Sequence, residues 1–167
     1  MKKLVPVVGL AGYSGAGKTT FLEKLIIELK SRGYRIGVIK HTHHHVEFDQ
    51  PGKDTWRHAR AGADFVALAT PDGYSIFKKT AGDPGPEVLI SMAGELDLII
   101  IEGYKTGKWP KIEVFYRHGT ARRLDVPADE LLAVVSDAPY LTAAPRFDLE
   151  DAAGVADYIE RAVFKKS

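Results

Sequence analysis

The sequence contains no cysteine, and this absence excludes two kinds of architecture. With 0 Cys in 167 residues, the chain has neither a disulfide framework nor a thiolate metal site, and it fits a reducing compartment. No apolar run approaches the roughly 20 residues that a membrane-spanning helix needs. The formal net charge is only +1, so no global field attracts nucleic acid or a membrane surface. We therefore expect a cytoplasmic protein with neither nucleic acid nor membrane as a partner, in which any anion site is local.

The first residues are charged and then apolar, which is also the outline of a secretory signal peptide. Glycines interrupt the apolar part of MKKLVPVVGLAGYSG early, so a buried strand over residues 4–11 is the better interpretation. The length of 167 residues suits a single domain spanning residues 1–167.

Strands and helices alternate along the chain. One face of a helix is predicted by the spacing of Leu22, Leu25, Ile26 and Leu29, and Gly33 marks its end. A strand over residues 34–40 follows, so we expect a parallel pair of strands with a right-handed crossover.

The remaining elements are predicted from turn signals and apolar runs. They are a helix over 56–61 capped by Asp54 or Thr55, a hairpin of strands 64–70 and 74–79, a short helix between Pro86 and Gly94, buried strands over 96–103 and 131–137, and a last helix capped by Asp148. The segment PKIEVFYR alternates and begins with a proline, which favours an antiparallel or edge strand. The alternation of elements predicts an α/β protein with helices on both faces of its sheet.

Residues 12–19, GYSGAGKT, match the phosphate-binding pattern G-x-x-x-x-G-K-[ST]. Glycines let the backbone curve so that successive N–H groups face one concavity, and the helix that starts near Lys18 adds its own unpaired N–H groups. A chance match in a glycine-rich turn is the alternative, but this match follows a predicted strand and opens a predicted helix. The expected phosphate ligands are Gly12, Ser14, Gly15, Ala16, Gly17, Lys18, Thr19 and Thr20.

With this motif, the expected fold becomes a P-loop NTPase-type three-layer sandwich: a mostly parallel sheet with an antiparallel hairpin extension. The Thr19 hydroxyl would ligate Mg²⁺, and a second acidic group should hold the metal or a water molecule. Glu102 ends the aliphatic strand LIIIEG, and ligands in parallel sheets bind at the carboxyl ends of strands. A solvated carboxylate is the alternative for Glu102, whereas Asp97 belongs at the far end of the same strand.

A polar segment, KHTHHH, follows the second strand at its carboxyl end and should lie near the phosphates. The histidines at positions 41–45 suggest Zn²⁺ or Ni²⁺. No cysteine completes such a site, and alternate residues of an extended segment point to opposite sides, so a solvated or anion-facing cluster is favoured. Asp49 is a second candidate for the Mg²⁺ shell or for positioning a water molecule. For Asp54, a role in the site and a role as a helix cap are equally well supported. The candidates for a second anion or substrate are His41, Lys53, Arg57, His58 and Lys105.

Several of these stretches together resemble the MobB family of molybdopterin-guanine dinucleotide biosynthesis proteins. They are GYSGAGKTT, VIKHTHHH…FDQPGKDTWRHARAGA, LIIIEGYK and PKIEVFYR, and the resemblance runs from about Val7 to Asp137. It implies a GTP-binding P-loop homodimer with weak GTP hydrolysis that assists the MobA-type guanylyltransferase, the enzyme that attaches GMP to molybdopterin. It also implies the matching positions: Gly15, Gly17, Lys18, Thr19 and Thr20 for phosphate and Mg²⁺, Glu102 as the acidic residue, and a polar block of Asp49, Lys53, Asp54, Arg57 and His58 without assigned individual roles.

The sequence lacks the N-K-x-D motif that reads guanine in small GTPases. Asp137 ends the strand LLAVVSD, where its carboxylate could accept hydrogen bonds from guanine N1–H and N2–H and reject adenine; a turn cap before Pro139 is the alternative. The preference for GTP therefore follows mainly from the resemblance.

Two other functions stay open. One is a P-loop kinase or ligase that acts on a small molecule. Such an enzyme should have an identifiable lid, and the loop from Lys105 to Trp109 is short for one, which disfavours this function. The other is a metal-delivery NTPase that uses the histidines at positions 41–45. The hairpin over 65–79 and the alternating strand offer edges through which a homodimer could form.

Overall fold

The computed structural model describes residues 4–116, 124, 126–139 and 142–164. The chain divides into two compact units, Met1–His41 with Val88–Ser167, and Thr42–Glu87. The expectation of one domain over residues 1–167 stays a prediction. None of the helices in the described part of the chain is long and apolar enough to cross a membrane.

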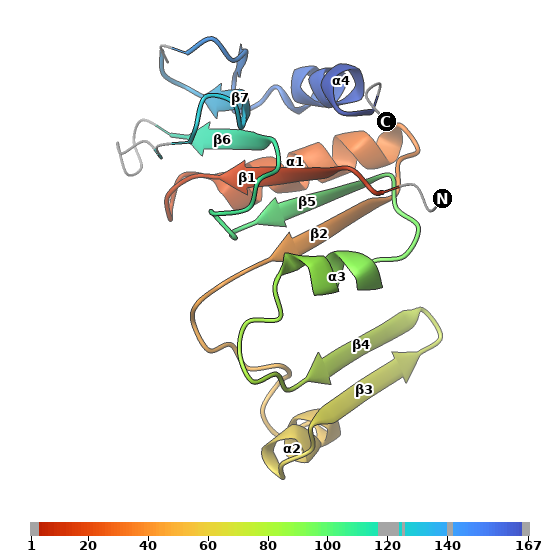
Figure 1. Cartoon of the computed structure of the whole chain (residues 1–167). Coiled ribbons are helices and arrows are strands. Elements are labelled where there is room, and N and C mark those ends of the chain that lie inside the picture. The colour runs from red at the N-terminus through yellow and green to blue at the C-terminus, as the bar shows by residue number, and fades with distance from the viewer. Residues whose placement is uncertain (1–3, 117–123, 125, 140–141, 165–167) are drawn as a thin grey trace. The chain divides into compact units, whose positions relative to one another are not determined.

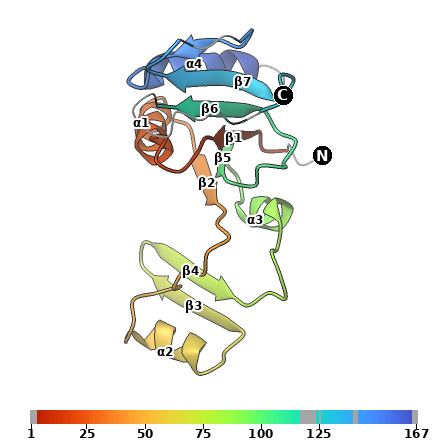
Figure 2. The same ribbon diagram turned by 90° about the vertical axis from the view of Figure 1, so that its left-hand side faces the viewer.

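The first unit is built on a six-stranded sheet with the order β2-β5-β1-β6-β7-β8, and Figure 2 shows β7 to β2 following one another in this order. All of its pairings are parallel (Figure 1). The strands β1 and β2 run parallel in the same sheet, as predicted, although β5 lies between them. The bounds are β1 Val7–Ala11, β2 Ile36–Lys40, β5 Leu98–Glu102, β6 Lys111–Phe115, β7 Leu131–Ser136 and β8 Arg146–Phe147.

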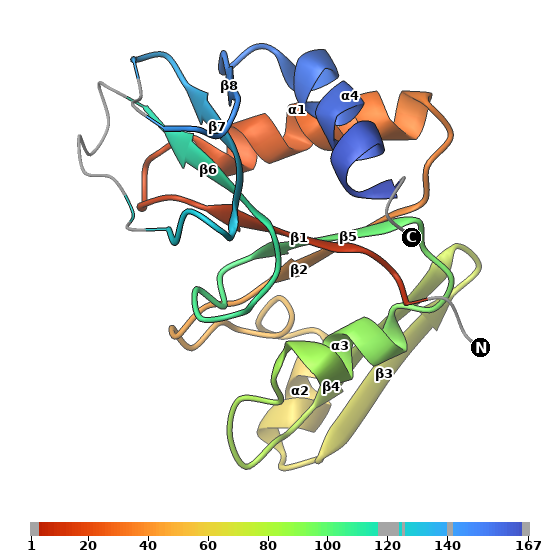
Figure 3. The ribbon, with the colours of Figure 1, turned by 45° about the horizontal axis from the view of Figure 1, so that its top comes forward.

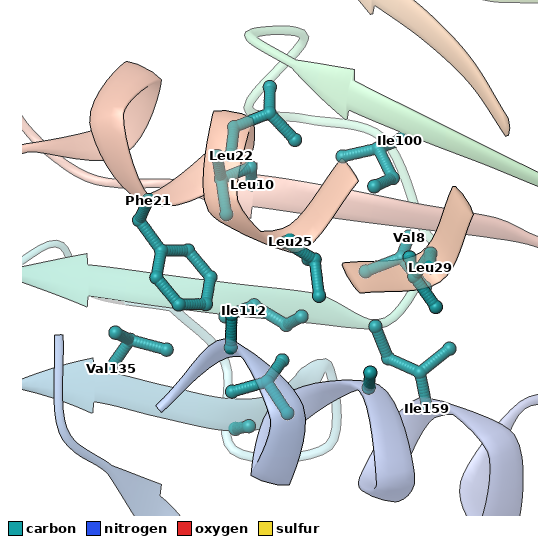
Figure 4. Close-up of a cluster of buried hydrophobic side chains, with 14 of the residues drawn as sticks. Val8, Leu10, Phe21, Leu22, Leu25, Leu29, Ile100, Ile112, Val135 and Ile159 are labelled. Carbon is teal, nitrogen blue, oxygen red and sulfur yellow. The ribbon is translucent and has the colours of Figure 1, made fainter. Parts of the chain in front are cut away.

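Two helices, α1 (Lys18–Ser31) and α4 (Ala152–Ala162), lie side by side on one face of this sheet (Figures 1 and 3). Their apolar faces and the sheet enclose the main core (Figure 4). The predicted helix face is confirmed, with Ile26 only partly buried at its margin. The core side chains labelled in Figure 4 are Val8, Leu10, Phe21, Leu22, Leu25, Leu29, Ile100, Ile112, Val135 and Ile159.

The opposite face of the sheet is crossed by the loop that joins β5 to β6. Because β5 and β6 flank β1 and run parallel to it, residues 103–110 must pass across β1. Trp109 in this loop packs against Gly9, where an added Cβ would lie 2.5 Å from the indole Nε1. The Gly9 N–H also donates to the carbonyl of Pro110 at 2.8 Å. Gly9 is therefore needed for this crossing.

The strand β6 lies between β1 and β7, so the expectation of an antiparallel or edge strand is wrong. Two charged residues of this central strand, Lys111 and Glu113, are only 4% and 1% exposed. The Lys111 ammonium pairs with Glu130, and Glu113 accepts a hydrogen bond from the Leu124 N–H at 2.8 Å. These partners inside the fold replace water, and they allow charged residues on a central strand.

Two predicted helix caps are also wrong. The cap of α4 is Asp151, whose carboxylate accepts a hydrogen bond from the Gly154 N–H at 2.9 Å. Asp148 lies one turn earlier, where its carbonyl accepts from the Asp151 N–H. In the second unit, α2 (Asp54–Arg60) begins with Asp54 itself as a helical residue, and the preceding Lys53 provides no side-chain cap.

The second unit carries α2 and an antiparallel hairpin of β3 (Phe65–Thr70) and β4 (Gly73–Lys78), which confirms the predicted hairpin. One face of the hairpin packs within the unit: Val66 is buried, and its partner Phe77 lies 4.9 Å from Phe48 between ring centroids. The helix α3 (Pro86–Met92), also predicted, spans the boundary between the two units.

Replacing Gly9 with alanine should destabilise the protein, because the new methyl group would lie 2.5 Å from Trp109 Nε1 and 3.1 Å from Lys111 Cγ. Overpacking of this kind costs about 1–3 kcal/mol. Urea denaturation followed by circular dichroism measures the free energy of unfolding. Gly82→Ala is the matched control, since an added Cβ there meets nothing within 4 Å. Equal stability of the two variants would contradict the packing of Trp109 on Gly9.

Candidate phosphate-binding site

The loop between β1 and α1 has the backbone that the glycine motif predicts. Gly12, Gly15 and Gly17 have positive φ angles of 151°, 77° and 80°. An added Cβ at Gly12 would lie 2.5 Å from the Val114 carbonyl, whereas at Gly15 and Gly17 it would meet nothing within 4 Å. Close packing thus requires glycine at position 12. At positions 15 and 17 the left-handed backbone conformation favours glycine, and the space beside both residues is open.

The amino-terminal end of α1 carries no compensating negative charge. Its cap, Gly17, makes no side-chain hydrogen bond, and the first turn contains no acidic residue. The first N–H groups of a helix lack partners within the helix, and they sit at the positive end of its dipole. This end of α1 is therefore electrostatically suited to an anion such as phosphate.

Lys18 reaches back over the same loop. Its Nζ donates hydrogen bonds to the carbonyl oxygens of Gly12 at 2.9 Å and Tyr13 at 2.8 Å. Burial lowers the pKa of Lys18; the nearby Glu102 carboxylate opposes this effect, and the charges of Lys105 and Lys40 add to it. The ammonium group is therefore partly withdrawn from water, in the field of one carboxylate and two other ammonium groups.

Glu102 lies at the carboxyl end of β5, as predicted, between the ends of β1 and β2. It is opposite Leu10 in the pairing with β1 and opposite Lys40 in the pairing with β2. Its side chain is 13% exposed, and its Oε1 lies 3.7 Å from Lys40 Nζ. Lys40 was not among the predicted site residues, although its place as the last residue of a strand parallel to β5 could have indicated it.

The loop after Glu102 turns sharply back toward the strand ends. Gly103 has a φ of 101° and Tyr104 a φ of 45°, which is uncommon for a residue with a side chain. The Tyr104 ring stacks on His41 with centroids 4.0 Å apart. Lys105 Nζ lies 5.8 Å from the centroid of the Tyr13 ring in the phosphate loop. This turn brings Lys105 close to the glycine loop, and it was not apparent from the sequence.

Asp137 directly follows β7 and is exposed. The turn that contains it is held by Ser136, whose Oγ accepts from the Ala138 N–H at 3.0 Å and whose carbonyl accepts from Arg146 Nη1 at 3.0 Å. Asp137 thus lies at the same carboxyl edge of the sheet as Glu102. Its contact with guanine stays a prediction.

The other predicted site residues, Asp49, Lys53, Arg57 and His58, lie in the second unit, and their use at the phosphate loop stays a prediction. Asp49 accepts hydrogen bonds from the Thr55 hydroxyl and, at 2.7 Å, from the Gln50 N–H. Within the described ranges, no group of three or more His, Cys, Asp or Glu side chains could hold a metal ion. The histidines at positions 41–45 therefore gain no support as a metal site.

The parallel sheet and the glycine loop at the end of β1 define the class: an α/β protein with a P-loop fold. The family model described as "Molybdopterin guanine dinucleotide synthesis protein B", MobB, matches residues 7–137. The chain belongs to the MobB family.

Similar proteins agree with this assignment. The chain is 38% identical to a molybdopterin-guanine dinucleotide biosynthesis adapter protein of Haemophilus influenzae, over 96% of this chain and 90% of that protein. The corresponding Escherichia coli protein is 35% identical, over 95% and 93%. The crystal structure of Bacillus subtilis MobB gives a TM-score of 0.72 at 23% identity over 95% of this chain and 98% of that one. A MobB homologue from Bacillus stearothermophilus gives 0.66 at 23% identity, over 93% and 95%. The likeness to the two solved structures shows the fold.

Replacing Thr55 with valine should raise the pKa of Asp49. The hydrogen bond from Thr55, followed by that from the Gln50 N–H, holds this pKa below its ordinary value of 3.8. A lowered pKa in the folded state stabilises the fold above the unfolded-state pKa, and this contribution is lost as the pH falls through the folded-state value. An NMR titration of the Asp49 carboxyl carbon measures the change.

The control for this experiment is Thr70→Val, because the Thr70 hydroxyl donates to the Gly73 carbonyl and leaves Asp49 untouched. An Asp49 pKa that stays the same in Thr55→Val would show that the hydroxyl does not hold the carboxylate.

Proposed function

We propose that this protein binds GTP·Mg²⁺ at the glycine loop and acts as an adapter in molybdopterin-guanine dinucleotide biosynthesis, where it assists a MobA-type guanylyltransferase. The observation that carries the nucleotide proposal is the loop itself, with open space beside Gly15 and Gly17 and an uncapped helix end after Gly17. The adapter role is supported by membership of the MobB family and by the names of the two bacterial relatives.

Each residue of the loop would have a distinct task. The N–H groups of Gly15 and of residues 17–20 would donate to phosphate oxygens, whereas the Ala16 N–H donates to the Tyr13 carbonyl. The Lys18 ammonium group would move from the loop carbonyls to the phosphate chain. The Thr19 hydroxyl and the Glu102 carboxylate would hold Mg²⁺, directly or through water. The metal would neutralise phosphate charge when bound.

Hydrolysis of GTP by this site would be slow. Phosphoryl transfer depends on positioning and charge neutralisation, and it needs an ordered water molecule. Glu102 or Asp49 would order that water, but Glu102 would already serve as a ligand of Mg²⁺, and Asp49 is engaged by Thr55. A site of this kind binds nucleotide and turns over little, which suits an adapter.

The loop after Glu102 favours an adapter over a kinase with a lid. Trp109 is packed beneath Gly9, and the Gly107 carbonyl accepts a hydrogen bond from Lys111 Nζ at 2.6 Å. Because these contacts hold the loop at Gly107 and at Trp109, it is poorly suited to open and close over an acceptor substrate.

Lys18→Ala should abolish GTP binding, because it removes the ammonium group that lies against the loop carbonyls of Gly12 and Tyr13. Isothermal titration with GTP·Mg²⁺ measures the affinity. Lys30→Ala, an exposed lysine in the last turn of the same helix, is the control and should bind as the unchanged protein does. Unaltered affinity in Lys18→Ala would refute the nucleotide site.

The adapter role has its own readout in the same pair of variants. The guanylylated cofactor formed by a purified MobA-type enzyme is measured with and without the protein. The unchanged chain and Lys30→Ala should increase product formation, whereas Lys18→Ala should not. An absence of stimulation by the unchanged protein would refute the adapter role and leave the binding result standing.

A homodimer is proposed on the outer face of the hairpin. Phe65, Tyr74 and Ile76 lie on the same face of the β3–β4 ladder, and their exposed fractions are 55%, 75% and 37%. A two-stranded hairpin is marginally stable by itself in water, so a second copy that covers these side chains would stabilise it.

Ile76→Glu should therefore shift the protein from dimer to monomer, because a charge would enter the covered face. Sedimentation velocity at micromolar concentration measures the mass, and circular dichroism checks the fold. Ile27→Glu is the matched control, since Ile27 is 70% exposed on α1. A monomeric mass for the unchanged protein would contradict the dimer.

A further inference from the structure

Lys40 is a cationic residue at the site whose task the proposed nucleotide binding does not explain. It is the last residue of β2 and lies opposite Glu102 in the β2–β5 register. The two side chains differ greatly in exposure, 62% for Lys40 and 13% for Glu102. An exposed ammonium thus faces a carboxylate that is largely withdrawn from water.

The contact between these residues is an ion pair without a direct hydrogen bond. Lys40 Nζ lies 3.7 Å from Glu102 Oε1, which is beyond hydrogen-bond distance. Ion pairs of an exposed side chain contribute little to stability. The pair therefore balances the charge of Glu102 while leaving the lysine able to move.

The position of Lys40 places it on the phosphate side of the sheet. The strand β5 lies between β1 and β2, and neighbouring strands are about 4.8 Å apart, so the ends of β1 and β2 are separated by about 10 Å. The charges of Lys40, Lys105 and Glu102 all act on Lys18. One compact polyanion at the end of β1 would therefore be attracted by the ammonium groups and repelled by the Glu102 carboxylate.

Mg²⁺ would change the balance around Glu102. If Glu102 held Mg²⁺, the metal would neutralise the carboxylate in place of Lys40. The two cations beside one carboxylate would then repel each other. The released ammonium would then be available for the terminal phosphate. A nucleoside diphosphate lacks the third phosphate, so it has no group to which this ammonium could donate.

We propose that Lys40 is the residue that distinguishes a nucleoside triphosphate from a diphosphate at this site. Lys40 is the counter-ion of Glu102 in this structure, and with a bound triphosphate it would donate to oxygens of the third phosphate. This inference rests on the proposed function, since it requires a nucleotide in the glycine loop.

The experiment compares GTP and GDP, each with Mg²⁺, by isothermal titration of the full chain. Lys40→Met should weaken GTP binding about ten- to hundred-fold, the size of a lost hydrogen bond to a charged group. GDP binding should change less than about three-fold. Lys40→Arg should restore most of the preference, because it keeps a cationic donor at the same strand end. Lys30→Met, at the far end of α1, is the control and should leave both affinities unchanged.

The outcomes separate this inference from the proposed function. If the unchanged protein binds neither nucleotide, both are overturned. If it binds both and Lys40→Met weakens them equally or not at all, the nucleotide site stands and the role of Lys40 is overturned. A selective loss of GTP binding that Lys40→Arg repairs would support the inference.

Discussion

The main-chain pairing of β5 with β1 on one side and β2 on the other determines the geometry of the candidate site. Both pairings are parallel and in a fixed register, so Lys40 and Glu102, the last residues of β2 and β5, lie side by side with Leu10 near the end of β1. Glu102 lies on the same face of β5 as the core residues Leu98 and Ile100, and a slip of one residue would turn it to the opposite face of the sheet. The burial of aliphatic side chains on both faces of β5 resists that slip, because Leu98 to Ile101 are at most 1% exposed. The core thereby fixes where the charges lie.

The site uses two different sources of positive potential. One is the backbone, through the glycine loop and the uncapped start of α1. The other is a set of ammonium groups, Lys18, Lys40 and Lys105, around one carboxylate. Lys18 is held by carbonyl oxygens, and Lys40 is paired with Glu102. Both lysines thus have partners inside the protein, and this limits the repulsion among them.

Sequence reasoning worked where a local pattern has one physical meaning, and it failed where a distant partner changed that meaning. The alternation along β6 favoured an antiparallel or edge strand, but the strand is central in the sheet. Its buried charges are tolerated there because Glu130 pairs with Lys111 and the Leu124 N–H donates to Glu113. Asp148 and Asp151 are both plausible caps in a sequence, and only the path of the turn selects Asp151. The segment that begins with Lys40 was expected near the phosphates, but its pairing with Glu102 and the stacking of Tyr104 were not predicted, because these contacts come from a neighbouring strand and from a backbone turn with positive φ.

The sequence by itself determined the glycine loop, the helix that follows it, the aliphatic strand that ends in Glu102 and the hairpin. It did so because glycine spacing, apolar periodicity and turn residues act over a few neighbours along the chain. Only the tertiary structure decided that Trp109 crosses beneath Gly9 and that Lys40 faces Glu102. These contacts depend on strand order, and strand order is set by how the buried faces pack across the whole sheet.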